Sequence, residues 1–244
     1  ETLLQREVEQ DLKLATEVQK AFLPQEPPHA PGFEVDSFYQ AANHIGGDYF
    51  DYIHLKDGRV GVVVADVVGH GVAAAMFMAK LSAETRFCLA GEPDVARAIE
   101  KLNDRMSTLD VERFVTFLLI VIDPAQDEVT IVNAGHMPPI VRSSESGEVS
   151  EPGGEESGLP IAIDTGMDYE AVRLKVHPAA SDAIKDRIVD AVLKHVGDAP
   201  PFDDMCLVVI RRTAAAQAVA EQESERDTQV GDTVDEDVID SSIG

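Results

Sequence analysis

The stretch from Tyr49 to Ala65 reads YFDYIHLKDGRVGVVVA, and it decides the fold class because it holds two apolar segments joined by a short polar turn. Tyr49 to Leu55 and Val60 to Ala65 each have the length and composition of a β-strand. The turn between them, Lys56-Asp57-Gly58-Arg59, is typical of a β-hairpin. The sequence therefore predicts two antiparallel strands, the second of which runs directly into Asp66.

Aspartates stand at the ends of predicted strands in places far apart along the chain. Gly46-Gly47-Asp48 precedes the hairpin, Asp66 opens the segment Asp66 to Gly71, and Asp203-Asp204 precedes an apolar run. Hard divalent cations take oxygen ligands, so carboxylates without Cys pairs or clustered His favour Mg²⁺ or Mn²⁺ over Zn²⁺. The pattern predicts a metal-dependent hydrolase. Asp beside Gly also commonly caps turns, which is the structural alternative for Asp48 and Asp66.

The composition indicates one acidic domain with appended segments. A chain of 244 residues with 44% hydrophobic residues can bury one substantial core. Its formal net charge of −25 argues against a nucleic-acid or anionic-membrane partner. Thr213 to Gly244 holds nine acidic residues and one basic residue, so we expect a disordered acidic tail over 213–244. A regulatory or partner-binding tail is the alternative.

The sequence also predicts where the protein resides. No stretch approaches the length of a membrane span, and the N-terminus lacks the pattern of a signal peptide. Cys88 and Cys206 lie in apolar runs and form no CxxC pair, which indicates buried thiols in a reducing compartment. We therefore expect a cytoplasmic protein. Because the chain opens inside a predicted helix without an initiator Met, we also expect a fragment of something longer.

The first residues predict a helix separate from the main domain. Glu1 to Phe22 carries apolar residues at alternating steps of three and four, and Pro24 follows. The helix either packs on its own domain or forms a coiled-coil connector to an upstream sensor or partner subunit. The expected organisation is a linker helix over 1–24, a single domain over 25–212 and the tail over 213–244.

The remaining periodicities alternate between strands and helices. The predicted strands are Phe33–Ala41, Phe114–Asp123, Glu128–Ala134, Leu159–Ile163, Tyr169–Val176 and Met205–Arg211, and the predicted helices are Val72–Leu89, Pro93–Met106 and Ser181–His195. Strands joined by hairpins, with helices inserted between them, predict an α+β sandwich of antiparallel sheets covered by helices. We expect the cluster Met76-Phe77-Met78 to lie in the core.

Five motifs in order carry a resemblance to a known family. They are Gly46–Asp51 (GGDYFD), Asp66–Gly71 (DVVGHG), Asn133–Pro139 (NAGHMPP), Gly158–Ile163 (GLPIAI) and Asp203–Met205 (DDM). Together they resemble the SpoIIE/RsbU-type serine phosphatases, which are bacterial members of the PPM (PP2C-like) metal-dependent phosphatases. The resemblance covers about residues 10–212.

The resemblance implies a PP2C-like β-sandwich of two antiparallel sheets flanked by helices, with two Mn²⁺ or Mg²⁺ ions in a cleft at one end. By motif position, Asp48 and Asp66 are the catalytic metal ligands, the backbone carbonyl of Val67 is a further ligand, and Asp203 binds one ion. The two cations would hold a bridging water, lower its pKa and neutralise the phosphoryl oxygens during in-line attack. Asp51 and Asp204 are expected to support these ligands.

Two histidines near these motifs could suggest zinc. His70 and His136 are flanked by Gly and Pro without ligand spacing, so we interpret them as residues that shape loops. Gly69-His70-Gly71 stands before a predicted helix and could also hold phosphate through backbone N–H groups.

The chain departs from the family pattern in two places. Cys206 stands where the family usually has Thr. After the strand that corresponds to Tyr169–Val176, the family has a Gly-Asp turn, another core strand and a Thr/Ser-Asp-Gly segment whose Asp binds a metal. Here His177-Pro178 leads directly into the predicted helix, and Asp182 is not assigned that role.

The functional expectation is a protein serine/threonine phosphatase. The alternative is a catalytically weak or inactive phosphatase-like module that binds a partner and signals through the N-terminal helix. The resemblance implies a phosphorylated STAS-type anti-anti-sigma protein as substrate, in a partner-switching stress response that controls a sigma factor. It also implies an upstream sensor or regulator acting through the N-terminal helix, and it leaves a homodimer open.

Overall fold

The fold is a set of antiparallel strands in layers with helices outside them. The computed structural model describes residues 3–42, 45–109, 111–179, 184–197 and 203–214. The strands in these residues are β1 (Phe33–Gln40), β2 (Asp48–His54), β3 (Val60–Val67), β4 (Val115–Asp123), β5 (Glu128–Ala134), β6 (Val141–Arg142), β7 (Val149–Ser150), β8 (Ala171–Lys175) and β9 (Met205–Arg212). The helices are α1 (Leu3–Lys20), α2 (Val72–Gly91), α3 (Val95–Ser107) and α4 (Ile184–Val196).

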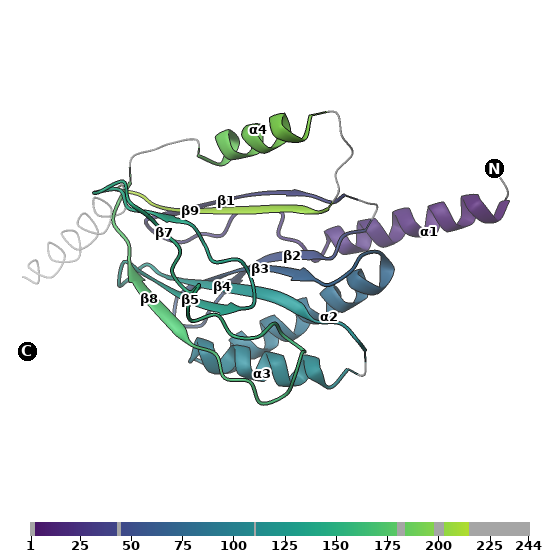
Figure 1. The fold of residues 1–244 in the computed structure, drawn as a ribbon, viewed down its shortest axis with the longest axis horizontal. Coiled ribbons are helices and arrows are strands. Elements are labelled where there is room, and N and C mark those ends of the chain that lie inside the picture. The colour runs from purple at the N-terminus through teal and green to yellow at the C-terminus, as the bar shows by residue number, and fades with distance from the viewer. Residues whose placement is uncertain (1–2, 43–44, 110, 180–183, 198–202, 215–244) are drawn as a thin grey trace, which may run out of the picture.

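The main layer is a five-stranded antiparallel sheet in the order β2-β3-β4-β5-β8. The hairpins β2–β3 and β4–β5 form as the sequence predicts. β4 reads VTFLLIVID and sits at the centre of the sheet, where an apolar run buried on both faces fits. The helices α2 and α3 cover one face of this sheet (Figure 1). Their contact buries large side chains such as Met78, Leu81 and Ile99 completely.

The second layer is a small sheet in which β1 pairs with β9 in antiparallel register. It lies on the other face of the main sheet, and α4 lies outside it (Figure 1). The predicted α+β sandwich is therefore confirmed, but its layers are unequal, since this sheet has two strands in the described part of the chain. Residues 176–179 leave β8 without forming a further strand, in agreement with the departure noted after Val176. The predicted helix start at Ser181, and Asp182, lie outside the described residues.

Two local predictions are wrong. Leu159–Ile163 is not a strand: Ile161 makes a single bridge to Val115, with N···O distances of 2.9 and 2.8 Å. Ile161 is nevertheless fully buried, whereas Leu159 and Ile163 are 51% and 48% exposed, so one residue of the apolar run belongs to the core. Met76 is 70% exposed, whereas Phe77 and Met78 are buried, because successive helical residues point in directions about 100° apart.

The helix α1 extends away from the layered body (Figure 1). Its apolar side chains Leu14 and Val18 are 55% and 60% exposed, whereas Gln19, in its last turn, is buried. A helix packed on its own domain would bury its apolar positions first. Whether α1 packs on its own domain or forms a connector stays a prediction.

Other sequence expectations are tested in part. In the described residues, no helix combines the length and the apolar character that crossing a bilayer requires. Cys88 is buried, Cys206 is half-buried, and both are free thiols. The acidic tail lies outside the described residues apart from Thr213 and Ala214.

The central strand gives a direct test of the core. Leu119→Ala should lower the free energy of unfolding by about 3 kcal/mol, because Leu119 is fully buried and the truncation leaves a cavity. Leu159→Ala is the matched control, since Leu159 is 51% exposed and should change stability by less than about 1 kcal/mol. Urea unfolding of both variants checks this, and equal losses would contradict the placement of β4.

Candidate metal centre

The centre is built on the β2–β3 hairpin. The antiparallel register pairs Asp48, the first residue of β2, with Asp66 near the end of β3. Directly opposed residues in such a pair project from the same face of the sheet. Here the two side chains lie close enough for each to shift the pKa of the other. The hairpin therefore brings together two of the predicted ligands.

The acidic side chains shift one another's pKa values. Burial, followed by the charges of Asp66, Asp204 and Asp203, raises the pKa of Asp48 to about 8. Loss of hydration and the charge of Asp203 also raise the pKa of Asp66, although its hydrogen bond with Asp48 lowers it. Carboxylates that repel one another in this way form a site that a cation would stabilise.

The start of β9 supplies the other aspartates. The side chain of Asp204 is half-buried and binds the turn that carries Asp48. Its oxygens accept hydrogen bonds from the backbone N–H groups of Ala42 at 2.8 Å, Gly47 at 2.8 Å and Asp48 at 3.4 Å. Asp204 therefore holds the first residue of β2 against the second sheet. It acts as the supporting residue that the sequence indicated.

The turn at Gly46 leaves no room for a side chain. A Cβ there would lie 2.3 Å from Asp204 Oδ2 and 2.5 Å from the Tyr39 hydroxyl. That hydroxyl is buried and has no hydrogen-bond partner among the described residues. Burial, followed by the charges of Asp204 and Asp48, raises the pKa of Tyr39. An orphaned hydroxyl beside the carboxylates is a group that solvent around a bound cation would satisfy.

The loop after β3 brings the Val67 carbonyl close to the same turn. A Cβ on Gly47 would lie 3.0 Å from the Val67 oxygen, so the chain segments that carry Asp48 and Val67 pass close together. Gly69 and Gly71 have φ values of 91° and 79°, which glycine adopts readily. Gly71 caps α2 without a side-chain hydrogen bond. The path of the loop from Val68 to Gly71 therefore depends on the positive φ angles of these glycines.

Asp51, the other residue expected to support the ligands, is a buried carboxylate with hydrogen-bond partners in β2 and α2. It is fully buried, and its carboxylate accepts hydrogen bonds from the Tyr49 hydroxyl and Arg86, both at 2.6 Å, and from the Tyr52 N–H at 2.8 Å. Burial raises its pKa, and these partners oppose the shift. Asp51 ties β2 to α2 behind the hairpin.

Some residues around the centre were not singled out from the sequence. Thr116 pairs with Asp66 across β3–β4, and its hydroxyl lies 2.8 Å from His136 Nδ1. Burial lowers the pKa of His136, whose backbone N–H donates to Asn133 Oδ1 at 2.9 Å. This geometry agrees with a loop-shaping role for His136. Arg113 donates to the Val68 carbonyl at 2.7 Å. No pattern in the sequence indicated Arg113 or Thr116 directly. Thr116 lies in β4, the strand that pairs with β3, and Arg113 lies just before it.

The helix α1 also contacts the turn. Gln19 Nε2 donates to the Gly46 carbonyl at 2.6 Å, and the Gly46 N–H donates to Gln19 Oε1 at 3.1 Å. Gln19 is therefore bound to a residue two positions before Asp48. The amphipathic pattern of α1 gave no indication of this contact, because it marks apolar positions.

The donor chemistry fits a hard divalent cation, since the aspartate side chains offer carboxylate oxygens and the backbone of Val67 offers a carbonyl oxygen. Within the described residues, however, no group of three His, Cys, Asp or Glu side chains comes together as a possible metal site. Asp48 and Asp66 form a pair, and Asp203 is exposed at the start of β9. The roles of Asp48, Asp66, Val67 and Asp203 as ligands stay predictions.

Comparison with known proteins identifies the family. The family model described as Stage II sporulation protein E (SpoIIE) matches residues 56–181, which is more than half of the chain. The chain belongs to the SpoIIE family. The match begins in the β2–β3 turn, so the SpoIIE-type segment includes β3 with Asp66 and the loop that follows it.

Two curated relatives of this SpoIIE-family chain come from Bacillus subtilis (strain 168). Phosphoserine phosphatase RsbP is 26% identical over 233 residues, which cover 82% of this chain and 57% of RsbP. Phosphoserine phosphatase RsbU is 22% identical over 172 residues, which cover 68% of this chain and 49% of RsbU. The chain thus spans about half the length of the curated relatives it matches.

A solved structure supports the fold of this SpoIIE-family chain. The SiaA-PP2C domain of Pseudomonas aeruginosa superposes with a TM-score of 0.70 at 16% identity, over 86% of this chain and 98% of that domain. At this identity the similarity shows the fold alone. It confirms the PP2C-like sandwich that the motifs implied.

The tight turn at Gly46 gives a test of the centre's architecture. Gly46→Ala should lower the free energy of unfolding by about 1–3 kcal/mol, because the new methyl group would displace Asp204 or Tyr39. Gly91→Ala is the matched control, since nothing lies within 4 Å of a Cβ built there. Thermal or urea unfolding measures both. A Gly46→Ala protein as stable as the control would show that the turn is looser than described.

Proposed function

We propose that this chain is a divalent-metal-dependent protein phosphatase that hydrolyses phosphoserine or phosphothreonine. The observation that carries the proposal is the pairing of Asp48 with Asp66 at the end of the main sheet. Membership of the SpoIIE family and the similarity to the phosphoserine phosphatases RsbP and RsbU support the same reaction.

Asp48, Asp66, Asp203 and the Val67 carbonyl would hold two Mn²⁺ or Mg²⁺ ions. Such ions supply a water of lowered pKa and neutralise charge on the phosphoryl oxygens. The fold of the chain would hold the carboxylates of Asp48 and Asp66 close together in spite of their like charges. Asp204 fixes the backbone of Asp48, and the β2–β3 register fixes Asp66 opposite it. Preorganisation of this kind lets a site bind a cation without first moving its ligands.

A weak or inactive phosphatase-like binding module is the second candidate. Two observations in the described residues favour it: the absence of a three-residue metal group and the two-stranded second sheet. Such a module would keep the fold and bind a partner without turnover. The two functions differ in whether metal and Asp66 are needed for hydrolysis.

Hydrolysis of a phosphoserine protein with added Mn²⁺ tests the proposal. Asp66→Asn should reduce turnover by at least about 100-fold, because it removes a ligand charge from the pair, and a chelator should do the same to the unchanged protein. Asp168→Asn is the matched control, since Asp168 is exposed in the loop before β8 and should leave turnover unchanged.

Far-ultraviolet circular dichroism would establish that the Asp66→Asn protein is folded. Full turnover in this variant would refute the site assignment. Absence of turnover in the unchanged, folded protein at every Mn²⁺ concentration would support the binding module instead.

Partners and regulation extend the proposal. By similarity, the substrate is a phosphorylated STAS-type anti-anti-sigma protein in a sigma-factor partner-switching pathway of the cytoplasm. An upstream sensor or regulator would act through α1, either within one chain or in a homodimer. The exposure of Leu14 and Val18 supports such an input, as does the Gln19–Gly46 contact.

The input can be tested at Gln19. Gln19→Ala should lower the apparent Mn²⁺ affinity several-fold, because the turn before Asp48 loses both hydrogen bonds to α1. Gln10→Ala is the matched control on the exposed surface of the same helix. Activity titrated with Mn²⁺ gives the comparison. Identical titration curves for the two variants would show that the contact between α1 and the turn does not affect metal binding.

A further inference from the structure

The outer helix α4 leaves its apolar face uncovered. None of its residues is buried, and Ile188, Val192 and Leu193 are 42%, 41% and 39% exposed. The residues Ile184, Ile188, Ala191, Val192 and His195 recur at steps of three and four, so they form one stripe along the helix. An amphipathic helix at a protein surface normally buries such a stripe. Something else is therefore expected to cover it.

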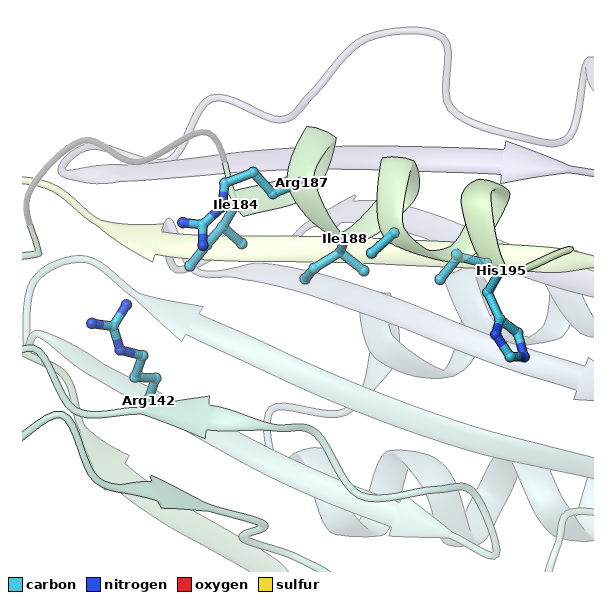
Figure 2. Close-up of a pocket in the computed structure, with 7 residues that line it drawn as sticks. Arg142, Ile184, Arg187, Ile188 and His195 are labelled. Carbon is cyan, nitrogen blue, oxygen red and sulfur yellow. The ribbon is translucent and has the colours of Figure 1, made fainter. Parts of the chain in front are cut away.

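That stripe forms one wall of a cavity of about 530 Å³, called here the α4 cavity. Figure 2 shows Ile184 and Ile188 on the helix, with Arg187 near one end and His195 at the other. Arg142, from β6, lies across the cavity from the helix (Figure 2).

The charges around the α4 cavity are opposite to those of the chain as a whole. Its lining contains the basic side chains Arg142 and His195, together with Arg187, which already has a partner of its own, and it contains no acidic side chain within the described residues. The whole chain, in contrast, has a net charge of −25. An aliphatic floor with a basic rim fits a partner that combines aliphatic and acidic side chains.

The chain itself carries a segment of this chemistry. Residues 230–243, called here the acidic segment, read VGDTVDEDVIDSSI. They contain five aliphatic residues, which are Val230, Val234, Val238, Ile239 and Ile243, and five acidic residues, which are Asp232, Asp235, Glu236, Asp237 and Asp240. No basic residue interrupts them. The acidic segment is thus complementary to the α4 cavity in both polarity and charge.

The connection between the two is short enough for binding within one chain. The described residues end at Ala214, directly after β9, and β9 belongs to the sheet that α4 covers. The chain from Ala214 to Val234 can span about 65 Å when extended, whereas α4 is about 20 Å long. A tether of this length gives a local concentration in roughly the millimolar range. Even a weak contact would then be occupied.

We infer that the acidic segment binds intramolecularly in the α4 cavity. Its aliphatic side chains contact the Ile and Val side chains of α4, and its carboxylates face the basic rim. The bound segment covers the exposed stripe and offsets the positive charge of the lining. This interaction is independent of phosphatase activity.

Amide hydrogen exchange of α4 in the full chain tests the inference. The triple variant Asp235→Asn, Glu236→Gln, Asp237→Asn should exchange about tenfold faster over residues 184–196, the change that three exposed charge contacts together produce. The variant Val238→Ser, Ile239→Ser should give a similar increase, because it removes the apolar contacts.

A second triple variant is the matched control. Glu221→Gln, Glu223→Gln, Glu225→Gln removes the same number of charges from the same part of the chain but lies outside the acidic segment. It should leave the exchange of α4 unchanged. Equal exchange in the unchanged chain and the first triple variant would overturn the inference, as would an equal acceleration by both triple variants.

A substitution in the α4 cavity and the dependence on protein concentration complete the test. Arg142→Glu should accelerate the exchange of α4, and combining it with the first triple variant should add little further acceleration, because both changes break one contact. Full additivity would contradict a shared interface. Protection of α4 that increases over a tenfold range of protein concentration would overturn intramolecular binding and identify a second copy as the occupant.

Discussion

The centre depends on the register of one hairpin. Because side chains alternate between the faces of a strand, a shift of β2 against β3 by one residue would place Asp48 and Asp66 on opposite faces. The turn Lys56–Arg59 fixes this register, with the Leu55 N–H donating to the Arg59 carbonyl at 2.9 Å. Loss of hydration at Asp48, together with the charges of Asp66 and the other aspartates, raises the pKa of Asp48 to about 8. A local turn thus establishes an electrostatic arrangement that favours a cation.

Long-range contacts add to this hairpin by fixing the backbone before Asp48. Asp204, directly before β9, binds it, and Gln19 binds it from α1, so the chain that enters the second sheet and the last turn of α1 both contact this turn. The Gln19–Gly46 hydrogen bonds therefore link α1 directly to the turn before Asp48. The same chain segment that carries Asp204 follows α4 in sequence, which places the α4 cavity one connection away from the centre.

Sequence reasoning predicted the features that depend on local pattern. The hairpins, α2 and α3 follow from periodicity and turn chemistry, and the structure confirms them. The strand predicted over Leu159–Ile163 was wrong because Ile161 reaches the core with a single bridge to Val115, while Leu159 and Ile163 stay exposed. The Asp204 contacts join residues up to 162 positions apart, and no local pattern contains that information. The hydrogen bonds between Gln19 and Gly46 were missed for the same reason, because they join residues 27 positions apart.

The central claim is that the opposed Asp48 and Asp66 hold a divalent cation. Anomalous diffraction from crystals of the protein grown with Mn²⁺ tests it most directly, because the signal locates the ion without reference to activity. The account predicts an anomalous peak between the two carboxylates, absent in crystals of the Asp48→Asn, Asp66→Asn protein. A well-ordered hairpin with no peak beside these side chains, or a peak elsewhere on the molecule, would contradict it.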